Sequence, residues 1–577
     1  MYIRQAICKL NKMCRHKSAF STRTKSNETN IIKSKSADIL IPNQLIHEYM
    51  WEHLDKWYDK TAVICFDTTK SYTFGEIYHK SVALAGVLRN KFQVNKGDTV
   101  AVVLPNVPDF PIVFLGTIQA GLVVTTVNPY YTPDEMAAQL ADSDSKLIFT
   151  TNELMPVINK CTKILRRSIP TVFESDNVPN ECIKLSELCD TRNSEIADFL
   201  NPDDVALLPY SSGTTGLSKG VQLTHKNVVS NLYQMSSPDF VVNLETRGNF
   251  QDVIPVFLPL FHIYGMVGIF LNFFAKGCKL IMVPTFVGPQ FIKILQLYQP
   301  TLLFAVPQMS KNFFRYQIFL HRFFLVVTIL NNPKIKYDNL KSIRTIISAA
   351  APLGASAVDE FNKKCKNRIN LLQMYGMTET SPLTLMQTAK LQNGAKVGGS
   401  GFVIPNTEVK IISISDNSTA LGPNQSGELV VRGPQNMKGY HNNPTATKKT
   451  IRNNWLRTGD ISYYDEDQHF FITDRLKELI KVKGFQVAPA ELEEILKSHP
   501  SVEDAAVVGI PHPVQGEAPK AFVVLKKEVR PELLKEFVAL KVANYKRLVG
   551  GVVVLKRIPR NCAGKVLRNE LRKLSNK

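Results

Sequence analysis

The chain has 577 residues, 44% hydrophobic and 21% charged, which excludes general disorder and allows several hydrophobic cores. Its formal net charge of +20 favours a polyanionic partner. Because no zinc finger, RGG tract or RNP-like pattern occurs, we do not expect nucleic acid to be that partner. The nine cysteines are scattered without a CxxC pair, as is typical of free thiols in a reducing compartment.

The N-terminal segment, residues 1–36, carries nine Lys or Arg against the single acid Glu28. Four residues recur there at helical spacing, with basic residues largely on the other side: Ile3, Ile7, Leu10 and Cys14. This pattern predicts a mitochondrial transit peptide, with a disordered basic tail as the alternative. The last four residues, 574–577, read Leu-Ser-Asn-Lys, which is not a peroxisomal SKL-type signal.

Short runs rich in Val, Ile and Leu alternate with helical patterns through most of the chain. Four clear runs are residues 99–104, 146–150, 279–283 and 345–347. Apolar strands separated by amphipathic helices predict an α/β fold with parallel-rich sheets covered by helices. We expect a large N-terminal domain over residues 37–473, with a β-rich subdomain at about 395–473. A small α+β domain should follow over residues 474–577.

Residues 253–275 are long and apolar enough to be mistaken for a membrane span. Pro255, Pro259, His262 and Asn272 interrupt this run. A buried strand–turn–helix of a large α/β core has the same pattern, and we favour that interpretation. We therefore expect peripheral membrane contact at most.

Residues 211–220 read SSGTTGLSKG and have the composition of a phosphate-binding loop. Three glycines allow successive backbone N–H groups to point at one anion, and hydroxyls and Lys219 add donors. The spacing is neither that of a Walker A loop nor that of a dinucleotide-binding fingerprint. Residues 521–577 carry fifteen Lys or Arg against four Glu, which indicates either a site for polyphosphate substrates or a solvated basic face.

The loop at 211–220 resembles the signature loop of the adenylate-forming superfamily, which contains acyl-CoA synthetases, 4-coumarate–CoA ligases and firefly luciferases. Further family motifs follow in the expected order at residues 259–265, 375–380, 458–460, 474–491 and 561–566. The resemblance covers about residues 40–575, and the overall sequence pattern is most similar to that of the 4-coumarate–CoA ligase-like branch. It implies a ligase that uses ATP and Mg²⁺ to activate a carboxylic acid as its acyl-adenylate. The acyl group then passes to coenzyme A.

The resemblance also implies roles for individual residues. Catalytic roles fall on Lys565, Lys481, Glu379 and His262, and Mg²⁺ is expected at Thr378 and Glu379, because it prefers oxygen ligands. The residues expected to bind ATP and AMP are Ser211, Ser212, Gly213, Thr214, Thr215, Lys219, Gln373, Tyr375, Thr378, Asp460, Arg475 and Lys565.

The remaining implied roles concern the acyl group, CoA and domain motion. The acyl pocket is expected at His262, Tyr264, Ala350, Met374 and Met386, and CoA at Lys483, Gly484 and Gln486. A hinge at Lys477 would make the small domain mobile, so that Lys565 and the 481–486 segment face the substrates in turn. The resemblance leaves a monomer and a homodimer equally open.

The chain departs from the family pattern at several positions. Ser218 replaces the usual proline of the loop, and Ala349 stands where glycine is common. Met374 stands where coumarate ligases tend to have glycine. A larger side chain at the pocket wall favours an aliphatic medium-chain acid over a flat aromatic one, although an arylpropenoic acid stays possible.

Residues 311–327 interrupt a stretch that in the family runs almost directly from a Val-Pro motif to an Asn-Pro motif. They are either an apolar and basic insertion that touches a membrane or unspliced sequence in the gene model, and we prefer the second. Two functional alternatives also stay open. One is a luciferase-like use of the adenylate, and the other is a catalytically degenerate binding protein.

Overall fold

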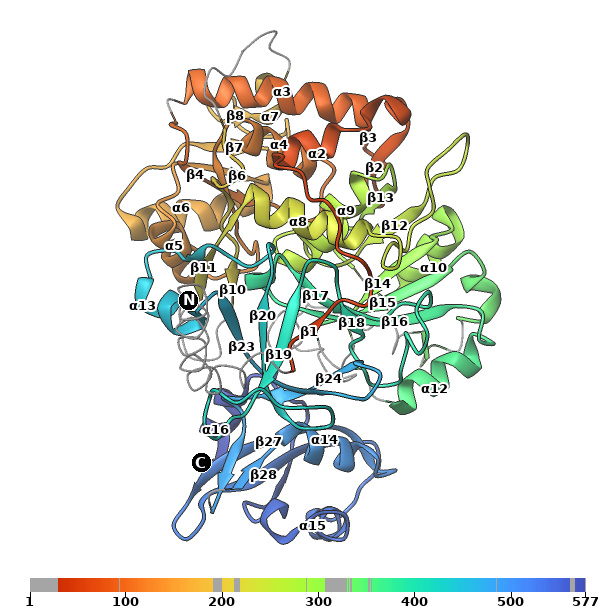
Figure 1. Cartoon of the computed structure of the whole chain (residues 1–577). Helices are drawn as coiled ribbons and strands as arrows, with labels where there is room; N and C mark the ends of the chain where they lie inside the picture. The colour runs from red at the N-terminus through yellow and green to blue at the C-terminus, as the bar shows by residue number, and fades with distance from the viewer. Residues whose placement is uncertain are drawn as a thin grey trace, which may run out of the picture.

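The computed structural model describes residues 30–92, 94–189, 200–211, 218–286, 288–306, 329–330, 332, 335–350, 353, 355–483, 485–560 and 566–575. A large domain and a smaller C-terminal domain lie one above the other (Figure 1). The predicted leader up to residue 29 and residues 311–327 lie outside the described residues. So do the predicted site residues Ser212, Gly213, Thr214, Thr215, Gly484 and Lys565, and the side chain of Gln486.

Three sheets form the main body of the large domain, and their central strands are parallel. The first, in spatial order, contains β10 (Tyr210–Ser211), β11 (Lys219–Thr224), β9 (Val205–Leu207), β5 (Val123–Thr126), β4 (Thr99–Val103), β6 (Leu147–Thr150), β7 (Thr171–Phe173) and β8 (Ile183–Lys184), with β21 (Gly439–Tyr440) on β11. The second contains β12 (Val253–Val256), β13 (Lys279–Met282), β2 (Thr61–Cys65) and β3 (Ser71–Thr73). The third contains β14 (Leu302–Ala305), β15 (Thr345–Ser348), β16 (Asn370–Gly376), β17 (Leu383–Met386) and β18 (Phe402–Val403).

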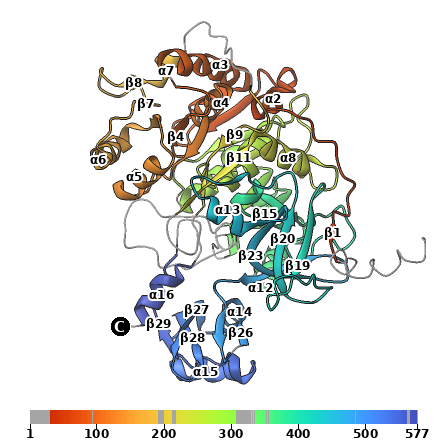
Figure 2. The same cartoon turned by 60° about the vertical axis from the view of Figure 1, so that its left-hand side comes forward.

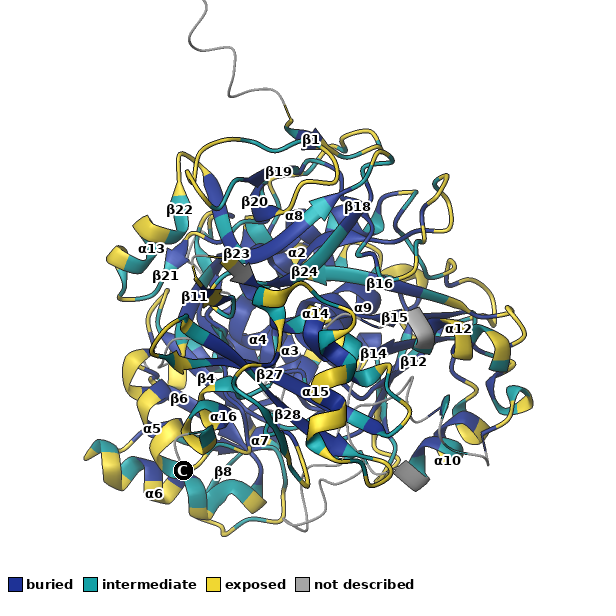
Figure 3. Ribbon diagram, turned by 90° about the horizontal axis from the view of Figure 1, so that it is seen from below, coloured by how far each residue is buried: buried dark blue, intermediate teal, exposed yellow. Residues whose placement is uncertain are grey.

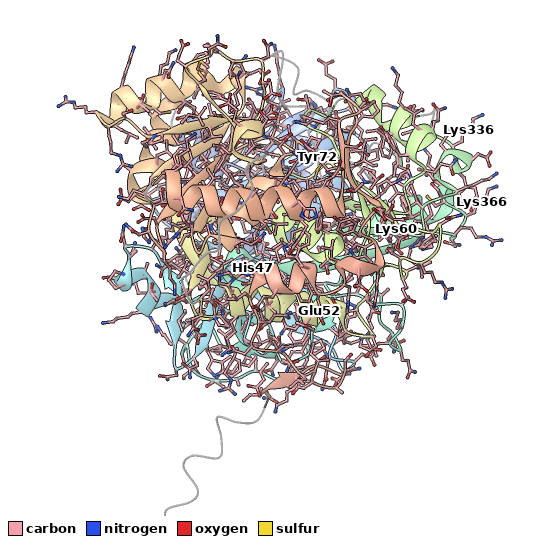
Figure 4. All side chains as sticks on the ribbon, turned by 90° about the horizontal axis from the view of Figure 1, so that it is seen from above. His47, Glu52, Lys60, Tyr72, Lys336 and Lys366 are labelled. Carbon is pink, nitrogen blue, oxygen red and sulfur yellow. The ribbon has the colours of Figure 1, made fainter. Side chains whose placement is uncertain are left out.

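All four apolar runs predicted as strands are confirmed as β4, β6, β13 and β15, each of which has parallel neighbours. Helices cover these sheets because their hydrophobic stripes need a partner surface. The helices of the large domain are α2 (Ile46–Trp51), α3 (Phe74–Lys91), α4 (Phe110–Gln119), α5 (Pro133–Asp142), α6 (Met155–Leu165), α7 (Leu185–Cys189), α8 (His225–Ser236), α9 (Asn272–Phe274), α10 (Gly288–Tyr298), α12 (Ala355–Lys364) and α13 (Pro444–Thr450). Viewed from the side opposite the small domain, Lys336 and Lys366 project outward at the rim (Figure 4). Part of the basic charge is therefore solvated, away from the core.

The long apolar run at residues 253–275 is part of the core, as predicted. Its first part is strand β12, and a π-helix, η3 (Tyr264–Leu271), continues into α9. All eight residues of η3 are buried. Within the described residues, no helix is both long and apolar enough to cross a membrane.

A fourth, antiparallel sheet forms the β-rich part next to the small domain. It contains β1 (Ile32–Lys33), β19 (Glu408–Ile412), β20 (Gly427–Arg432), β23 (Trp455–Tyr464) and β22 (Ile451–Arg452), with β24 (Phe470–Arg475) on β23. Strand β1 corrects the predicted boundary of the leader at residue 36. Ile32 pairs with Val409 and is buried, because an apolar residue here covers the edge of β19. The folded chain therefore begins before residue 37.

The small domain is built on its own five-stranded sheet. The sheet contains β26 (Phe485–Val487), β25 (Ile480–Val482), β28 (Gly516–Leu525) and β27 (Val502–His512), with β29 (Val552–Val554) on β28. Its helices are α14 (Pro489–Lys497), α15 (Pro531–Ala539) and α16 (Arg568–Ser575). The buried strands β27 and β28 lie behind exposed helix faces (Figure 3). Helix α16 lies at the end of this domain that faces the large domain (Figures 1 and 2).

Candidate active site

The two described ends of the predicted phosphate loop are paired with each other. Ser211 ends β10 and Lys219 begins β11, and these residues are antiparallel partners. The Lys219 ammonium lies 4.9 Å from the centroid of the Tyr440 ring. Tyr440 is held there because β21 pairs with β11. The hairpin therefore fixes where the loop leaves and re-enters the sheet.

Glu379 is a buried carboxylate next to this hairpin. It lies in a short 3₁₀ helix, η5 (Thr378–Thr380), directly after β16. Its Oε1 accepts a hydrogen bond from the Tyr440 hydroxyl at 2.8 Å and one from Ser211 Oγ at 3.3 Å. Burial, followed by the Glu379 charge, raises the pKa of Tyr440, which therefore stays a proton donor. Tyr440 was missed in the sequence because no motif includes it.

The residues around Glu379 fit a hard divalent cation. Carboxylate and hydroxyl oxygens are the ligands that Mg²⁺ prefers, and Thr378 is buried beside Glu379. Among the described residues, no group of three His, Cys, Asp or Glu side chains could enclose a metal ion. One carboxylate completed by substrate phosphates is a common way for proteins to hold Mg²⁺.

Asp460 lies at the centre of a second polar group. Its Oδ2 accepts from the Tyr375 hydroxyl at 2.7 Å, and its Oδ1 pairs with Arg475 Nε at 3.0 Å. Asp460 and Arg475 are directly opposite on β23 and β24, so the sheet register brings them together. Burial, followed by the Asp460 charge, raises the pKa of Tyr375 well above its ordinary value. A carboxylate has about four acceptor positions, so Asp460 keeps capacity for further hydroxyl donors.

Two cationic side chains lie beside these carboxylates: Arg475 pairs with Asp460, and Lys219 lies over the Tyr440 ring, whose hydroxyl donates to Glu379. Burial is the main cause that lowers the pKa of Lys477, and the charges of Lys219 and Arg475 lower it further. The charges that act on Lys477 come from β11 and β24, and Lys477 itself lies in the segment after β24. This cluster of positive charge is suited to a polyphosphate.

Among the described residues predicted in the small domain, Lys481 and Lys483 do not join this group. Lys481 and Lys483 are exposed, on β25 and in the turn after it. The Lys481 backbone N–H donates to Glu517 Oε2 at 2.7 Å. Within the described part of the chain, no hydrogen bond or ion pair links either lysine to Asp460 or Glu379.

A cavity lies in the large domain between η3, α9 and the third sheet. It is small: the centre of a water molecule can reach about 20 Å³ of it, within about 310 Å³ of unfilled space that includes open solvent. Met374 and Met386, both predicted for the acyl pocket, are opposite each other on β16 and β17 and line the cavity. Phe273 and Phe304 also line it, in edge-to-face-like contact at 5.1 Å between ring centroids. Aromatic and thioether side chains favour an apolar ligand.

The remaining predicted pocket residues are not part of the cavity lining. Tyr264 is buried behind the wall, and its hydroxyl donates to the Ile347 carbonyl at 3.3 Å. His262 Nδ1 accepts from the Tyr264 N–H at 3.3 Å. Ala350 is exposed and has a φ of 73°. Gln373, which was predicted to bind ATP and AMP, is buried on β16, where its side-chain oxygen accepts from the Leu353 N–H at 3.0 Å.

The comparisons with known proteins agree with this geometry. Residues 50–441 match the family model described as AMP-binding enzyme, and residues 491–565 match that of the AMP-binding enzyme C-terminal domain. The chain belongs to the AMP-binding enzyme family. The predicted membership of the adenylate-forming superfamily is thus confirmed.

The alignments with known relatives span nearly the whole chain. 4-Coumarate–CoA ligase 1 of Arabidopsis thaliana is 39% identical over 564 residues, which are 96% of each chain. 4-Coumarate:CoA ligase 1 of Petunia hybrida is 38% identical over 557 residues, which are 95% of this chain and 98% of the relative. A solved structure of o-succinylbenzoate CoA synthetase from Bacillus subtilis, in complex with the acyl-adenylate intermediate OSB-AMP, is 27% identical. It has a TM-score of 0.75 and covers 92% of this chain and 98% of its own.

These likenesses confirm the predicted α/β fold with a large and a small domain. The AMP-binding enzyme is therefore an adenylate-forming ligase of the acyl-CoA and 4-coumarate–CoA ligase type, which uses ATP and a carboxylic acid.

Proposed function

We propose that this enzyme joins a medium-chain aliphatic acid to coenzyme A and converts ATP to AMP and pyrophosphate. The observation that carries the proposal is the position of the cations Lys219 and Arg475 beside the carboxylates of Glu379 and Asp460. A polyphosphate and a carboxylate repel each other, so a site that joins them needs concentrated positive charge and fixed orientation.

In the first half-reaction, a carboxylate oxygen attacks the α-phosphorus of ATP. A bond from oxygen to phosphorus forms, the bond to the β-phosphate oxygen breaks, and pyrophosphate leaves. Lys219 is suited to the outer phosphates, and Glu379 would hold a Mg²⁺ ion, which would neutralise phosphate charge. Asp460 is suited to the ribose hydroxyls, since an ionised carboxylate only accepts hydrogen bonds.

In the second half-reaction, the CoA thiol loses its proton to solvent and its sulfur bonds to the acyl carbonyl carbon. The bond from that carbon to the phosphate oxygen breaks, and AMP leaves with the electron pair. Lys481 and Lys483 are exposed cations on the small domain and are suited to phosphates of CoA. They belong to a different sheet from Asp460, and residues 476–479 form the connection between the two sheets. We therefore propose that the small domain turns about Lys477 between the half-reactions.

The preference for an aliphatic acid is supported by the cavity. The flexible side chains of Met374 and Met386 lie side by side on the sheet that forms one wall and take up space that a flat aromatic ring would need. The alternative is an arylpropenoic acid, which is supported by the printed names of the 4-coumarate–CoA ligase relatives. Comparing AMP release with octanoate and with 4-coumarate separates the two. A clear preference for 4-coumarate would contradict the aliphatic proposal.

Carboxylate-dependent exchange between ATP and labelled pyrophosphate tests the reaction itself. We expect exchange with the native enzyme and its loss in Lys565→Ala. Lys573→Ala, an exposed lysine of α16, is the matched control and should leave exchange unchanged. Exchange as fast in Lys565→Ala as in the native enzyme would overturn the proposal.

Two further outcomes identify the alternatives. Adenylate formation without any CoA thioester would indicate a luciferase-like enzyme. Absence of exchange with every acid would indicate a degenerate binding protein.

A further inference from the structure

Lys276 lies in the acyl cavity, at a position that no recognised motif includes. It follows α9 and lines the cavity together with Asn272 and Phe273. Its ammonium donates to Asn272 Oδ1 at 2.6 Å and lies 5.5 Å from the centroid of the Phe273 ring. A lysine in a mostly apolar cavity is unusual, because an ammonium loses hydration there.

The charge of Lys276 has no acidic counterpart. Within the described residues, no Asp or Glu forms an ion pair with it, and its hydrogen-bond acceptor is a neutral amide. Burial lowers the pKa of Lys276 to about 8, so most of it is protonated at neutral pH. The Cys278 thiol also acts on Lys276, and burial raises the pKa of this thiol, so that it stays neutral. An ammonium has three N–H donors, and two of them stay available for a ligand.

The backbone around Lys276 is held firmly. Thr246 Oγ1 lies 3.1 Å from the carbonyl oxygens of both Lys276 and Gly277. Gly277 has a φ of 71°, and a Cβ atom there would come within 2.6 Å of the Trp57 ring. The chain therefore turns sharply after Lys276, at a place where glycine is required. These constraints fix the base of the lysine side chain at the cavity wall.

A purely structural role explains less of this arrangement. A lysine after a helix can stabilise the partial negative charge of the helix end. Such a lysine usually extends its ammonium into water, since its long stem allows it to do so. Here the residue lines the cavity instead, and its ammonium contacts residues that also line it.

We propose that Lys276 binds a second carboxylate at the far end of the acyl substrate, so that the enzyme acts on α,ω-dicarboxylic acids. This inference rests on the proposed ligase function and specifies its substrate. The distal carboxylate would accept hydrogen bonds from the two available N–H groups of Lys276 and neutralise its charge. The methylene chain between the two carboxylates would lie against Met374, Met386 and Phe304. A hydroxyl at the same position would accept a hydrogen bond but leave the charge unpaired.

The experiment measures kcat/KM for AMP release with matched pairs of acids. Each dicarboxylic acid of four to twelve carbons is compared with the monocarboxylic acid of the same length and with 4-coumarate. With the native enzyme we expect the best dicarboxylate to exceed its monocarboxylate by at least about 10-fold, because a buried polar group is left unpaired by the wrong substrate. Lys276→Met keeps a similar length without the charge and should reverse that ratio.

Lys279→Met is the matched control, since this lysine lies on β13 and is not part of the cavity lining. It should keep the native ratio. Thermal melting of each variant shows whether it is folded, and the ratio of the two acids does not depend on the fraction of active protein.

The outcomes separate the inference from the proposed function. A native enzyme that activates monocarboxylates or 4-coumarate better than every dicarboxylate would overturn the inference and leave the ligase function intact. A Lys276→Met variant that keeps the native ratio would also overturn it. Failure of every acid to support AMP release would overturn both.

Discussion

The proposed nucleotide-binding end of the site and the proposed acyl cavity differ in how their charged groups are paired. At the nucleotide end, Asp460 has Tyr375 and Arg475 as partners, and Glu379 has Tyr440. In the cavity, the Lys276 ammonium has a neutral amide and an aromatic ring as its partners among the described residues. The partners of Asp460 and Glu379 already hold these carboxylates in position for the nucleotide, which every reaction of this type uses. The Lys276 ammonium, in our proposal, gains an ion-pair partner only when the substrate carries a second carboxylate.

Asp460→Ala should have the largest effect, because it breaks the best-paired group. The change leaves the Tyr375 hydroxyl and the Arg475 guanidinium without their acceptor and removes the proposed ribose contact. Each loss costs about 1–3 kcal/mol, so we expect kcat/KM for ATP to fall by about 100-fold or more. Pyrophosphate exchange at varied ATP concentrations measures it.

The control for this variant is Asp467→Asn, which changes a carboxylate that is 43% exposed and pairs with Lys396. It should change kcat/KM by less than about twofold. An Asp460→Ala enzyme with native kinetics for ATP would show that this group supports the sheet and not the nucleotide.

Met374→Ala tests the other region and should have a smaller effect. Shortening the side chain widens the cavity beside Met386. We expect the ratio of kcat/KM for 4-coumarate to that for octanoate to rise by about 10-fold, because a few methylene-sized groups are worth about 1–3 kcal/mol. Met437→Ala, a buried methionine outside the cavity lining, should keep the native ratio. An unchanged ratio in Met374→Ala would exclude this residue as a determinant of width.

Much of the nucleotide end could be predicted from the sequence, because its parts lie in short segments with fixed local geometry. Asp460 and Arg475 belong to two motifs that become opposite positions of neighbouring strands. Tyr440 could not be predicted, since its contact with Glu379 depends on the pairing of β21 with β11 across most of the chain.

The cavity was predicted less completely, for a related reason. Met374 and Met386 were found beside a motif, whereas Phe304 and Lys276 come from elements that meet only after folding. A lysine directly after the apolar run at residues 253–275 was a usable signal, because a helix end in a core seldom carries one without a purpose. Strand β1 was missed because a pair of apolar residues is too short to show a strand period.

The unpaired charge of Lys276 should also be visible as a pH dependence of stability. In the folded protein its pKa is about 8, whereas in the unfolded chain it has the ordinary value of 10.5. The unfolded state therefore binds more protons between these values, so the free energy of unfolding should rise with pH across this window. Because the Lys276 side chain is partly exposed to the cavity, we expect the free energy of unfolding to rise by only about 1 kcal/mol across this window.

This contribution is measured as a difference between two proteins, since tyrosines and cysteines titrate in the same range. Urea unfolding of the native enzyme and of Lys276→Met is followed from pH 7 to pH 10.5. The native enzyme should gain stability relative to the variant as the pH rises. If the difference in stability between the two proteins did not change with pH, the Lys276 ammonium would be solvated. The two regions would then differ less in how their charges are paired.

Ala350→Gly should have the smallest effect and concerns the segment that joins the two regions. This segment leaves β15 next to Ile347, which lines the cavity, and reaches Leu353, which is bound by Gln373. Ala350 has a φ of 73°, a left-handed conformation that costs an alanine about 1–2 kcal/mol. Glycine removes that cost but makes the unfolded chain more flexible by roughly 0.5–1 kcal/mol. We therefore expect a net stabilisation of about 0.5 kcal/mol in urea unfolding.

The neighbouring Ala349 provides the control with the opposite sign. It is buried and is not among the residues with positive φ, so glycine there loses both a packed methyl group and chain stiffness. Ala349→Gly should destabilise the protein by about 1 kcal/mol. If both variants lost stability equally, Ala350 would not be strained. If Ala350→Gly stabilises the protein and Ala349→Gly destabilises it, the flanking strands hold the backbone of Ala350 in a conformation that alanine itself does not favour.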